Sequence, residues 1–283
     1  MGKLSGYLRL MRPINCLMMG FAVIVGAVLV SPNMLNALWQ NLIYGFLTGF
    51  MLTAASMIIN DYYDIEIDAV NEPNRPIPSG LIKPKEALVF AFALTAIGFA
   101  TAYLTSVFCF VIAIIAWIIS VTYTTVGKRS GLPGNFLVST CVVIPFIYGS
   151  VAVINEVKLN VLIFVSMVFL SITGREITKG IADVQGDRMQ KVKTLAVRYG
   201  EKTAAMAAAL FYLSAVSLSP IPWLLNLVSF WFIPLMAVTD FGLVASSFML
   251  LNDYSRENAR KVKNLVLLCF IFGLLAFVVG TLR

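Results

Sequence analysis

Carboxylate and amide side chains recur at intervals of four residues in two separate segments of the chain. The first segment carries Asn60, Asp64 and Asp68, and the second carries Asp183 and Asp187. On a helix, residues four apart lie on one face, where neighbouring carboxylates repel each other. Carboxylate and amide oxygens are hard ligands that suit Mg²⁺, which takes one or two carboxylates and completes its coordination with waters and phosphate oxygens. The two segments together therefore predict a site that binds a diphosphate through Mg²⁺.

Cationic side chains lie close to both segments in the sequence. Arg75 belongs to the proline-rich run 73–80, whose restricted backbone would hold the guanidinium over the first acidic face. Lys179 extends the four-residue spacing of the second segment, and Tyr123 precedes Lys128 at the end of an apolar stretch. Arginine and lysine bind phosphate oxygens and stabilise the charge of a leaving group. The alternative interpretations are a solvated acidic loop and, for Lys128, a cation that only fixes membrane topology.

The composition indicates a helical membrane protein. The chain has 283 residues, of which 59% are hydrophobic and 12% charged, whereas a soluble domain has about 45–50% apolar and about 25% charged residues. The apolar stretches are long and continuous, which excludes a β-barrel and predicts helices that span the bilayer. There is no histidine, so sites that need imidazole, such as a Ser-His pair or His-ligated zinc, are excluded. The four cysteines lie in apolar stretches without paired spacing, which is typical of small buried side chains.

The runs without charged residues have room for nine helices at about 20 residues per crossing. These runs are 13–60, 87–127, 130–155, 159–174, 203–239 (continuing to Asn252 with only Asp240 interrupting) and 264–282. Turn residues divide the first run at 31–33 and the fifth at 220–222, and a weaker break falls at 105–106. Because the run 159–174 is short, its helix is expected to continue through Gly180 on a partly polar face.

The basic residues orient these spans. With nine alternating spans, every lysine and arginine except Lys158 and Arg283 falls on one side, and that side is cytoplasmic by the positive-inside rule. We therefore predict a multi-pass protein of the cell membrane, a single domain over 1–283, with a cytoplasmic amino terminus and both acidic segments cytoplasmic. This rule explains most of the net charge of +7, so nucleic-acid binding is not expected. Asp240 is the only ionisable residue deep within a span, and we interpret it as a hydrogen-bonded contact between helices.

The acidic segments resemble the two signatures of the UbiA-type intramembrane prenyltransferases. The first signature is matched by Asn60, Asp61, Asp64 and Asp68, followed by Asn71, Arg75 and Pro76. The second is matched by Asp183 and Asp187, and a further basic element by Tyr123, Lys128 and Arg129. The similarity covers essentially the whole chain, including the number of spans and the placement of the motifs.

The resemblance implies an all-α bundle of nine transmembrane helices around a central cavity, with the acidic segments as a cytoplasmic cap. It also implies transfer of a prenyl group from a polyprenyl diphosphate through an allylic carbocation. The implied Mg²⁺ ligands are Asn60, Asp64, Asp183 and Asp187. The implied catalytic residues are Asp64, Asp68, Asp183, Asp187 and Lys128, where Asp68 would position or deprotonate the acceptor. The implied substrate-binding residues are Asn60, Asp61, Arg75, Tyr123, Lys128, Arg175, Lys179 and Lys193.

The second segment distinguishes acceptors within the family. The run 174–179 before Asp183, with Lys193 after it, most resembles members that transfer a geranylgeranyl group from geranylgeranyl diphosphate to the free hydroxyl of geranylgeranylglyceryl phosphate. This reaction forms the second ether bond of archaeal membrane lipids and implies a phosphorylated lipid acceptor. Other acceptors remain open, because the run 71–80 is similar to members that prenylate chlorophyllide, and 4-hydroxybenzoate is a further alternative. A membrane transporter is the alternative of a different class, but its charges would line a path at the bilayer midplane.

Overall fold

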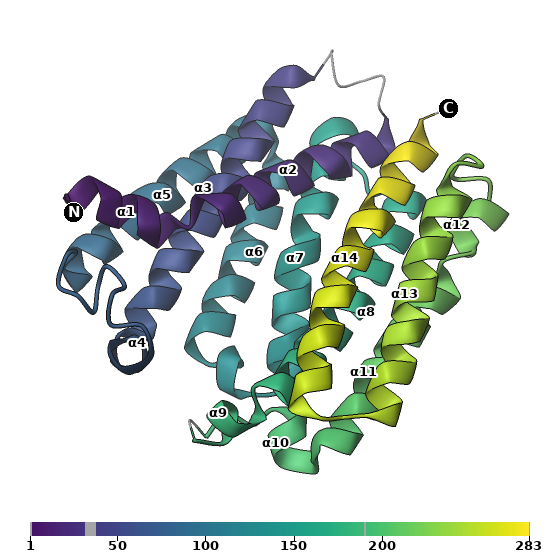
Figure 1. Cartoon of the computed structure of the whole chain (residues 1–283). Coiled ribbons are helices and arrows are strands. Elements are labelled where there is room, and N and C mark those ends of the chain that lie inside the picture. The colour runs from purple at the N-terminus through teal and green to yellow at the C-terminus, as the bar shows by residue number, and fades with distance from the viewer. Residues whose placement is uncertain (1, 32–37, 190, 283) are drawn as a thin grey trace. The chain divides into compact units, whose positions relative to one another are not determined.

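The computed structural model describes residues 2–31, 38–189 and 191–282, except for the side chains of three residues in α4, 67, 70 and 71. Within these ranges the structure contains helices and no strands (Figure 1). The long helices are α2 (Pro13–Val30), α3 (Trp39–Tyr63), α5 (Pro84–Thr105), α6 (Val107–Thr125), α7 (Leu132–Ile154), α8 (Leu159–Ala182), α11 (Glu201–Leu218), α13 (Phe232–Asn252) and α14 (Arg256–Thr281). The short ones are α1 (Lys3–Met11), α4 (Ile65–Asn71), η2 (Gly127–Arg129), α9 (Val184–Met189), α10 (Leu195–Tyr199) and α12 (Ile221–Leu224).

The predicted number of spans is confirmed for the described part of the chain, where nine helices are long and apolar enough to cross a membrane. Ser106 has an extended backbone and separates α5 from α6. Its hydroxyl accepts a hydrogen bond from the Cys109 amide in the first turn of α6. α8 continues past Gly180 to Ala182, as expected. The break expected at 31–33 falls largely outside the described residues, although α2 ends at Val30.

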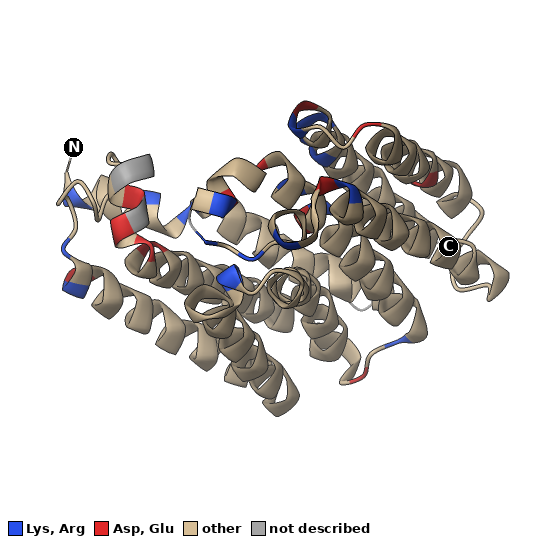
Figure 2. Ribbon diagram, turned by 90° about the horizontal axis from the view of Figure 1, so that it is seen from below, with Lys and Arg blue, Asp and Glu red and all other residues tan. Residues whose placement is uncertain are grey.

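By its contacts the chain divides into two compact units. Unit 1 comprises Met1–Ala27, Asn33–Thr125 and Ile144–Val157, and unit 2 comprises Val28–Pro32, Val126–Val143 and Lys158–Arg283. The prediction of one domain over 1–283 stays a prediction, and each unit is described separately. In both units most charged residues lie near helix ends (Figure 2), and Asp240 within α13 is an exception.

In unit 1, α3 packs against α1, α5 and α6. α2 approaches α7 closely because Gly26 and Gly149 carry no Cβ, and an added Cβ at Gly26 would overlap the backbone oxygen of Phe146. Small residues permit this close contact between transmembrane helices. The Tyr148 hydroxyl donates to Thr48 at 3.3 Å and to Thr105 at 3.1 Å, which joins α7 to α3 and α5 through buried polar groups.

In unit 2, the helices α8, α11, α13 and α14 form a closed arrangement in which each packs against two others. At one end of these helices lie α9 and α10, and at the other end lies α12 (Figure 1). The Ser219 hydroxyl donates to Asp240 Oδ2 at 2.5 Å, so Asp240 makes the expected hydrogen-bonded contact between helices. Lys158, one of the two basic residues on the predicted outer side, donates to the Val30 backbone oxygen at 2.9 Å and so satisfies a carbonyl at the end of α2.

We predict that Gly26→Ala lowers the thermal stability of the purified protein, because the added methyl group overlaps the α7 backbone. Overpacking of this kind costs about 1–3 kcal/mol. Gly273→Ala is the matched control, since its Cβ would lie 3.4 Å from the Thr239 side chain, an ordinary contact. Thermal unfolding in detergent should show a lower Tm for Gly26→Ala only; equal Tm values for the two variants would contradict the close contact of α2 with α7.

Candidate functional site

The first acidic motif lies at the junction of α3 and α4. α3 ends at Tyr63 and α4 begins at Ile65, so Asp64 lies between two helices. The four-residue backbone bonding nevertheless continues, since the Asp64 amide donates to the Asn60 oxygen at 3.0 Å and the Asp68 amide to the Asp64 oxygen at 2.7 Å. Asn60 Nδ2 donates to Asp64 Oδ2 at 3.0 Å. The expected common face is therefore formed despite the change of helix.

Two arginines neutralise the other carboxylates of this motif. Arg12, between α1 and α2, contacts Asp61 at 2.5 Å. Arg75 contacts Asp68 at 2.5 Å and Asp61 at 3.4 Å. The Asp61 and Asp68 side chains are only 4% and 8% exposed, and a buried carboxylate is costly unless it is paired. Arg12 and Arg75 thus supply part of the positive charge that balances the clustered carboxylates.

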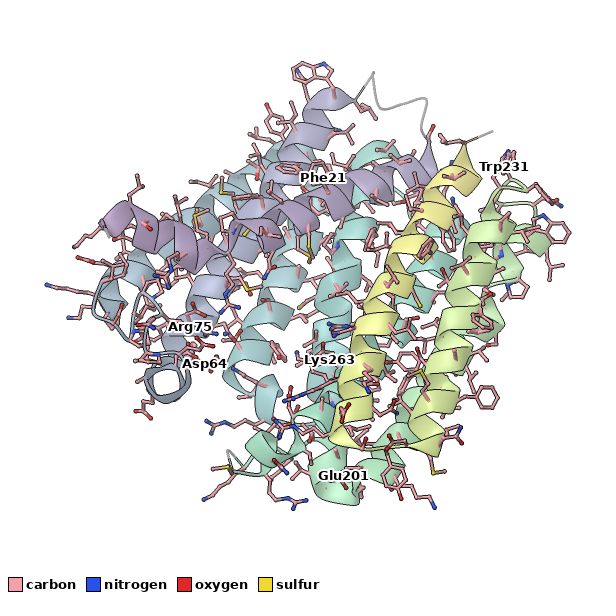
Figure 3. The ribbon with its side chains drawn as sticks, in the orientation of Figure 1. Phe21, Asp64, Arg75, Glu201, Trp231 and Lys263 are labelled. Carbon is pink, nitrogen blue, oxygen red and sulfur yellow. The ribbon has the colours of Figure 1, made fainter. Side chains whose placement is uncertain are left out.

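The proline-rich turn holds Arg75 as the sequence predicted. The Arg75 amide donates to the Glu72 oxygen at 2.9 Å, and the Arg75 oxygen accepts from the Ser79 amide at 3.0 Å. Ile77 and Ile82 anchor the turn, since both are buried. Arg75 and Asp64 accordingly lie together beside α4 (Figure 3).

These pairings separate the roles of the first motif's oxygens. Asp61 and Asp68 hold Arg12 and Arg75, whereas Asp64 and Asn60 present a carboxylate and an amide oxygen, which suit Mg²⁺. The role expected for Asp68 toward the acceptor stays a prediction. Tyr123, also a predicted substrate contact, is half-buried near the end of α6.

The second acidic motif lies at the end of α8. Asp183 follows the last residue of α8, and the Asp187 amide donates to the Asp183 oxygen at 3.0 Å. Both side chains are half-buried. Burial and the neighbouring Asp183 carboxylate raise the pKa of Asp187 to about 6, against the opposing effects of the Thr194 hydroxyl and Lys179. A raised pKa shows that negative charge is crowded here, as expected where a cation binds.

A backbone junction connects the predicted cations Lys128 and Lys193 to this motif. The Lys193 amide donates to the Arg129 oxygen at 3.2 Å. Gly131 has a φ of +76°, and an added Cβ there would overlap the Lys193 oxygen. Thr194 then caps α10, accepting from the Val197 amide at 3.4 Å. Lys128 and Lys193 are both exposed. The two turns that carry them are joined by the hydrogen bond from the Lys193 amide to the Arg129 oxygen.

The run before Asp183 contains an ion cluster. Glu176 Oε2 accepts from Lys179 Nζ at 3.2 Å, and Glu176 Oε1 accepts from Arg175 Nη1 at 3.3 Å. Among the described residues, Arg175 Nε is buried and has no hydrogen-bond partner. Sequence reasoning assigned Arg175 and Lys179 to the site but missed Glu176. The signal was present, because Glu176 precedes Asp183 by seven residues, two helical turns on one face.

The donor sets fit a metal that shares its coordination with a substrate. In the described ranges, no three Asp, Glu or Cys side chains come close enough to hold a metal by themselves. Each motif instead offers two oxygen-bearing side chains, Asn60 with Asp64 and Asp183 with Asp187. This matches Mg²⁺, which uses few carboxylates and takes phosphate oxygens as further ligands. The two motifs belong to different units.

Comparison with known proteins identifies the class. Residues 19–280 match the model of the UbiA prenyltransferase family, and the chain belongs to this family. The digeranylgeranylglyceryl phosphate synthase of Archaeoglobus fulgidus is 38% identical over 290 residues, which cover 99% of this chain and 98% of that protein. The chain is therefore a multi-pass membrane protein with the fold class and family that the motifs predicted.

Two solved structures are similar to the chain. One, concerned with the biosynthesis of digeranylgeranylglyceryl phosphate synthase in membranes, has a TM-score of 0.89 and 33% identity and covers 99% of both chains. The other is a UbiA homolog from Archaeoglobus fulgidus bound to GPP and Mg²⁺, with a TM-score of 0.68 and 19% identity, covering 96% of this chain and 99% of that one. The second likeness concerns the fold.

We predict that Arg12 and Asp61 are energetically coupled. Arg12→Met should destabilise the protein by a few kcal/mol, because it removes the closest positive charge from a buried carboxylate. The double variant Arg12→Met/Asp61→Asn should be more stable than Arg12→Met alone, since the unpaired charge is gone. Chemical unfolding in detergent measures the cycle, and strictly additive effects would contradict the pairing.

We also predict that Mg²⁺ affinity rises with pH through the pKa of Asp187. A proton and a metal compete for the same carboxylate, so the protonated form that dominates below a pKa of about 6 binds Mg²⁺ poorly. Calorimetric titration should show increasing affinity from about pH 5 to about pH 7. Asp187→Asn should bind more weakly with a flatter pH profile; a wild-type affinity independent of pH in this range would count against Asp187 as a ligand.

Proposed function

We propose that this protein transfers a geranylgeranyl group from geranylgeranyl diphosphate to the free hydroxyl of geranylgeranylglyceryl phosphate, forming the second ether bond of archaeal membrane lipids. The observation that carries the proposal is the 38% identity, across nearly the full length of both chains, to a digeranylgeranylglyceryl phosphate synthase. The products are the diether phosphate and diphosphate, so the site must bind a diphosphate strongly as it leaves. Two carboxylate motifs with adjacent arginines and lysines suit this task.

Both motifs would contribute ligands to the metal that binds the diphosphate. Asn60 and Asp64 from the first motif and Asp183 and Asp187 from the second would hold Mg²⁺, which would supply positive charge to the diphosphate. The presence of GPP and Mg²⁺ in a UbiA homolog of the same fold supports this assignment. Each motif provides only two oxygen-bearing side chains, so ligands from both motifs are needed to bind the metal and the diphosphate.

Basic side chains assist the departure of the diphosphate. Arg75 remains bonded to Asp68 and Asp61, and its guanidinium has further donors available for a phosphate oxygen because it carries five N–H groups. Lys128, which belongs to the second unit, also stabilises the leaving diphosphate, and Tyr123, Lys179 and Lys193 complete the substrate-binding set. The positive charges stabilise the leaving group, while the apolar span residues exclude water from the allylic cation.

The reaction takes place at the cytoplasmic ends of the spans. The distribution of lysine and arginine supports a cytoplasmic amino terminus. Both acidic motifs then lie on the side where water-soluble Mg²⁺ and diphosphate are available, and the prenyl chain extends into the bilayer. Charges at the span ends are unlike those of a transporter, whose ionisable residues line a midplane path.

Purified protein in detergent or liposomes, supplied with Mg²⁺, geranylgeranyl diphosphate and geranylgeranylglyceryl phosphate, should release diphosphate and form the diether. Parallel reactions with 4-hydroxybenzoate and chlorophyllide test the alternative acceptors. Neither should be prenylated at a rate comparable to that of geranylgeranylglyceryl phosphate. If 4-hydroxybenzoate or chlorophyllide is prenylated and geranylgeranylglyceryl phosphate is not, the proposed acceptor is wrong. The assignment as a prenyltransferase would still hold. Ion flux without turnover would overturn the enzyme assignment.

We predict that Asp64→Ala and Asp183→Ala each abolish turnover, because each removes an Mg²⁺ ligand. The carboxylate of Glu201, at the start of α11 and outside both acidic motifs, provides the control Glu201→Ala, which should keep wild-type activity. Circular dichroism and Tm should show that both Asp variants remain folded. Full activity in either of them would remove that residue from the metal site.

A further inference from the structure

Glu176 is a carboxylate on the membrane side of the second acidic motif. It lies seven residues before Asp183 in α8, which is two helical turns on the same face and about 10 Å along the axis. Its side chain is 12% exposed. A carboxylate within a membrane-spanning helix is costly and is typical of a functional site.

Arg175 beside it has an unsatisfied donor. Its Nη1 donates to Glu176, but its Nε is buried and has no hydrogen-bond partner among the described residues. A buried N–H without an acceptor costs about 1–3 kcal/mol. The Arg175 side chain as a whole is 22% exposed, so a substrate oxygen can approach the guanidinium from its exposed side. Phosphate is the anion that arginine recognises best.

The acceptor of the proposed reaction has two polar groups that must be recognised together. Its phosphate and its free hydroxyl are carried by the same three-carbon glycerol unit. A cation that binds the phosphate must therefore lie next to the group that receives the hydroxyl proton. Arg175 and Glu176 meet this condition, because they are consecutive residues whose side chains are 3.3 Å apart.

The position along the helix also favours Glu176 over Asp68 as the proton acceptor. The prenyl chain is apolar, so the reacting carbon lies on the membrane side of the diphosphate that carries it. Asp68 belongs to α4, which follows the end of the spanning helix α3. Glu176 lies within the spanning helix α8, on the membrane side of Asp183.

We infer, on the basis of the proposed function, that Arg175, Glu176 and Lys179 form the binding site for the acceptor's glycerol phosphate. Arg175 and Lys179 bind its phosphate, and Glu176 accepts its hydroxyl proton. In the step, the bond between the allylic carbon and the diphosphate oxygen breaks and its electron pair leaves with the diphosphate. A lone pair of the hydroxyl oxygen forms the ether bond, and the proton passes to the Glu176 carboxylate.

The ion pairs of Glu176 are compatible with this role. Each oxygen of the Glu176 carboxylate accepts one hydrogen bond, from Arg175 or from Lys179, and has a further lone pair. The group that loses the proton is an oxygen that has already bonded to a carbocation and is strongly acidic. Even a carboxylate stabilised by two cations is basic enough to accept it.

The test uses Glu176→Gln, which keeps the size of the side chain and removes the proton acceptor. Ether formation should fall about 10²-fold or more, while the KM for geranylgeranyl diphosphate stays unchanged. Diphosphate release should continue in part, with geranylgeraniol formed when water captures the cation. Glu201→Gln is the matched control and should form ether at the wild-type rate. Arg175→Met should raise the KM for the phosphorylated acceptor at least tenfold and leave the KM for the donor unchanged.

Glu176→Ala provides a second measurement that does not depend on the glutamine variant. Added formate should restore part of its ether formation, because a small carboxylate can occupy the vacated position. Wild-type ether yield in Glu176→Gln, or equal rises in both KM values, would overturn the inference and assign Glu176 to packing alone. Wild-type protein that cannot use the phosphorylated acceptor would instead overturn the proposed function, so the two failures are distinguishable.

Discussion

Asp61, Asp64 and Asp68 lie at the end of an apolar helix, where an unbalanced negative charge costs several kcal/mol. The positive charges beside them therefore decide how the motif is built. Arg12 comes from the turn between α1 and α2, and Arg75 comes from the turn after α4. These two arginines bind Asp61 and Asp68, whereas Asn60 and Asp64 are the proposed metal ligands. The first motif thus depends on contacts with segments on both sides of it in the sequence.

The second motif meets the same constraint in a different way. Burial raises the pKa of Asp187, and repulsion from the neighbouring Asp183 raises it further. Lys179 is shared with Glu176, and Thr194, which caps α10, gives Asp187 a hydroxyl hydrogen bond. A divalent cation at this motif would relieve the repulsion between Asp183 and Asp187.

The sequence predicted those features that depend on local periodicity. Hydropathy located the spans, and the four-residue spacing put Asn60, Asp64 and Asp68 on one face, because both depend on residues that are close together in the sequence. Contacts between distant segments could not be predicted from the sequence. Arg12 and Asp61 are 49 residues apart, and no local pattern pairs them. Glu176 lies seven positions before Asp183, so the four-residue spacing did not include it.

The sharing of one diphosphate by the two motifs is tested most directly by a double-mutant cycle on donor binding. The dissociation constant of an unreactive thiodiphosphate analogue of the donor would be measured with Mg²⁺ for the wild type, Asp64→Asn, Asp183→Asn and the double variant. If both carboxylates hold the same metal–diphosphate complex, each single variant weakens binding strongly and the double variant loses little more, which gives a coupling energy of about 1 kcal/mol or larger. Fully additive losses of binding free energy would show that the two motifs act independently and would contradict a shared site.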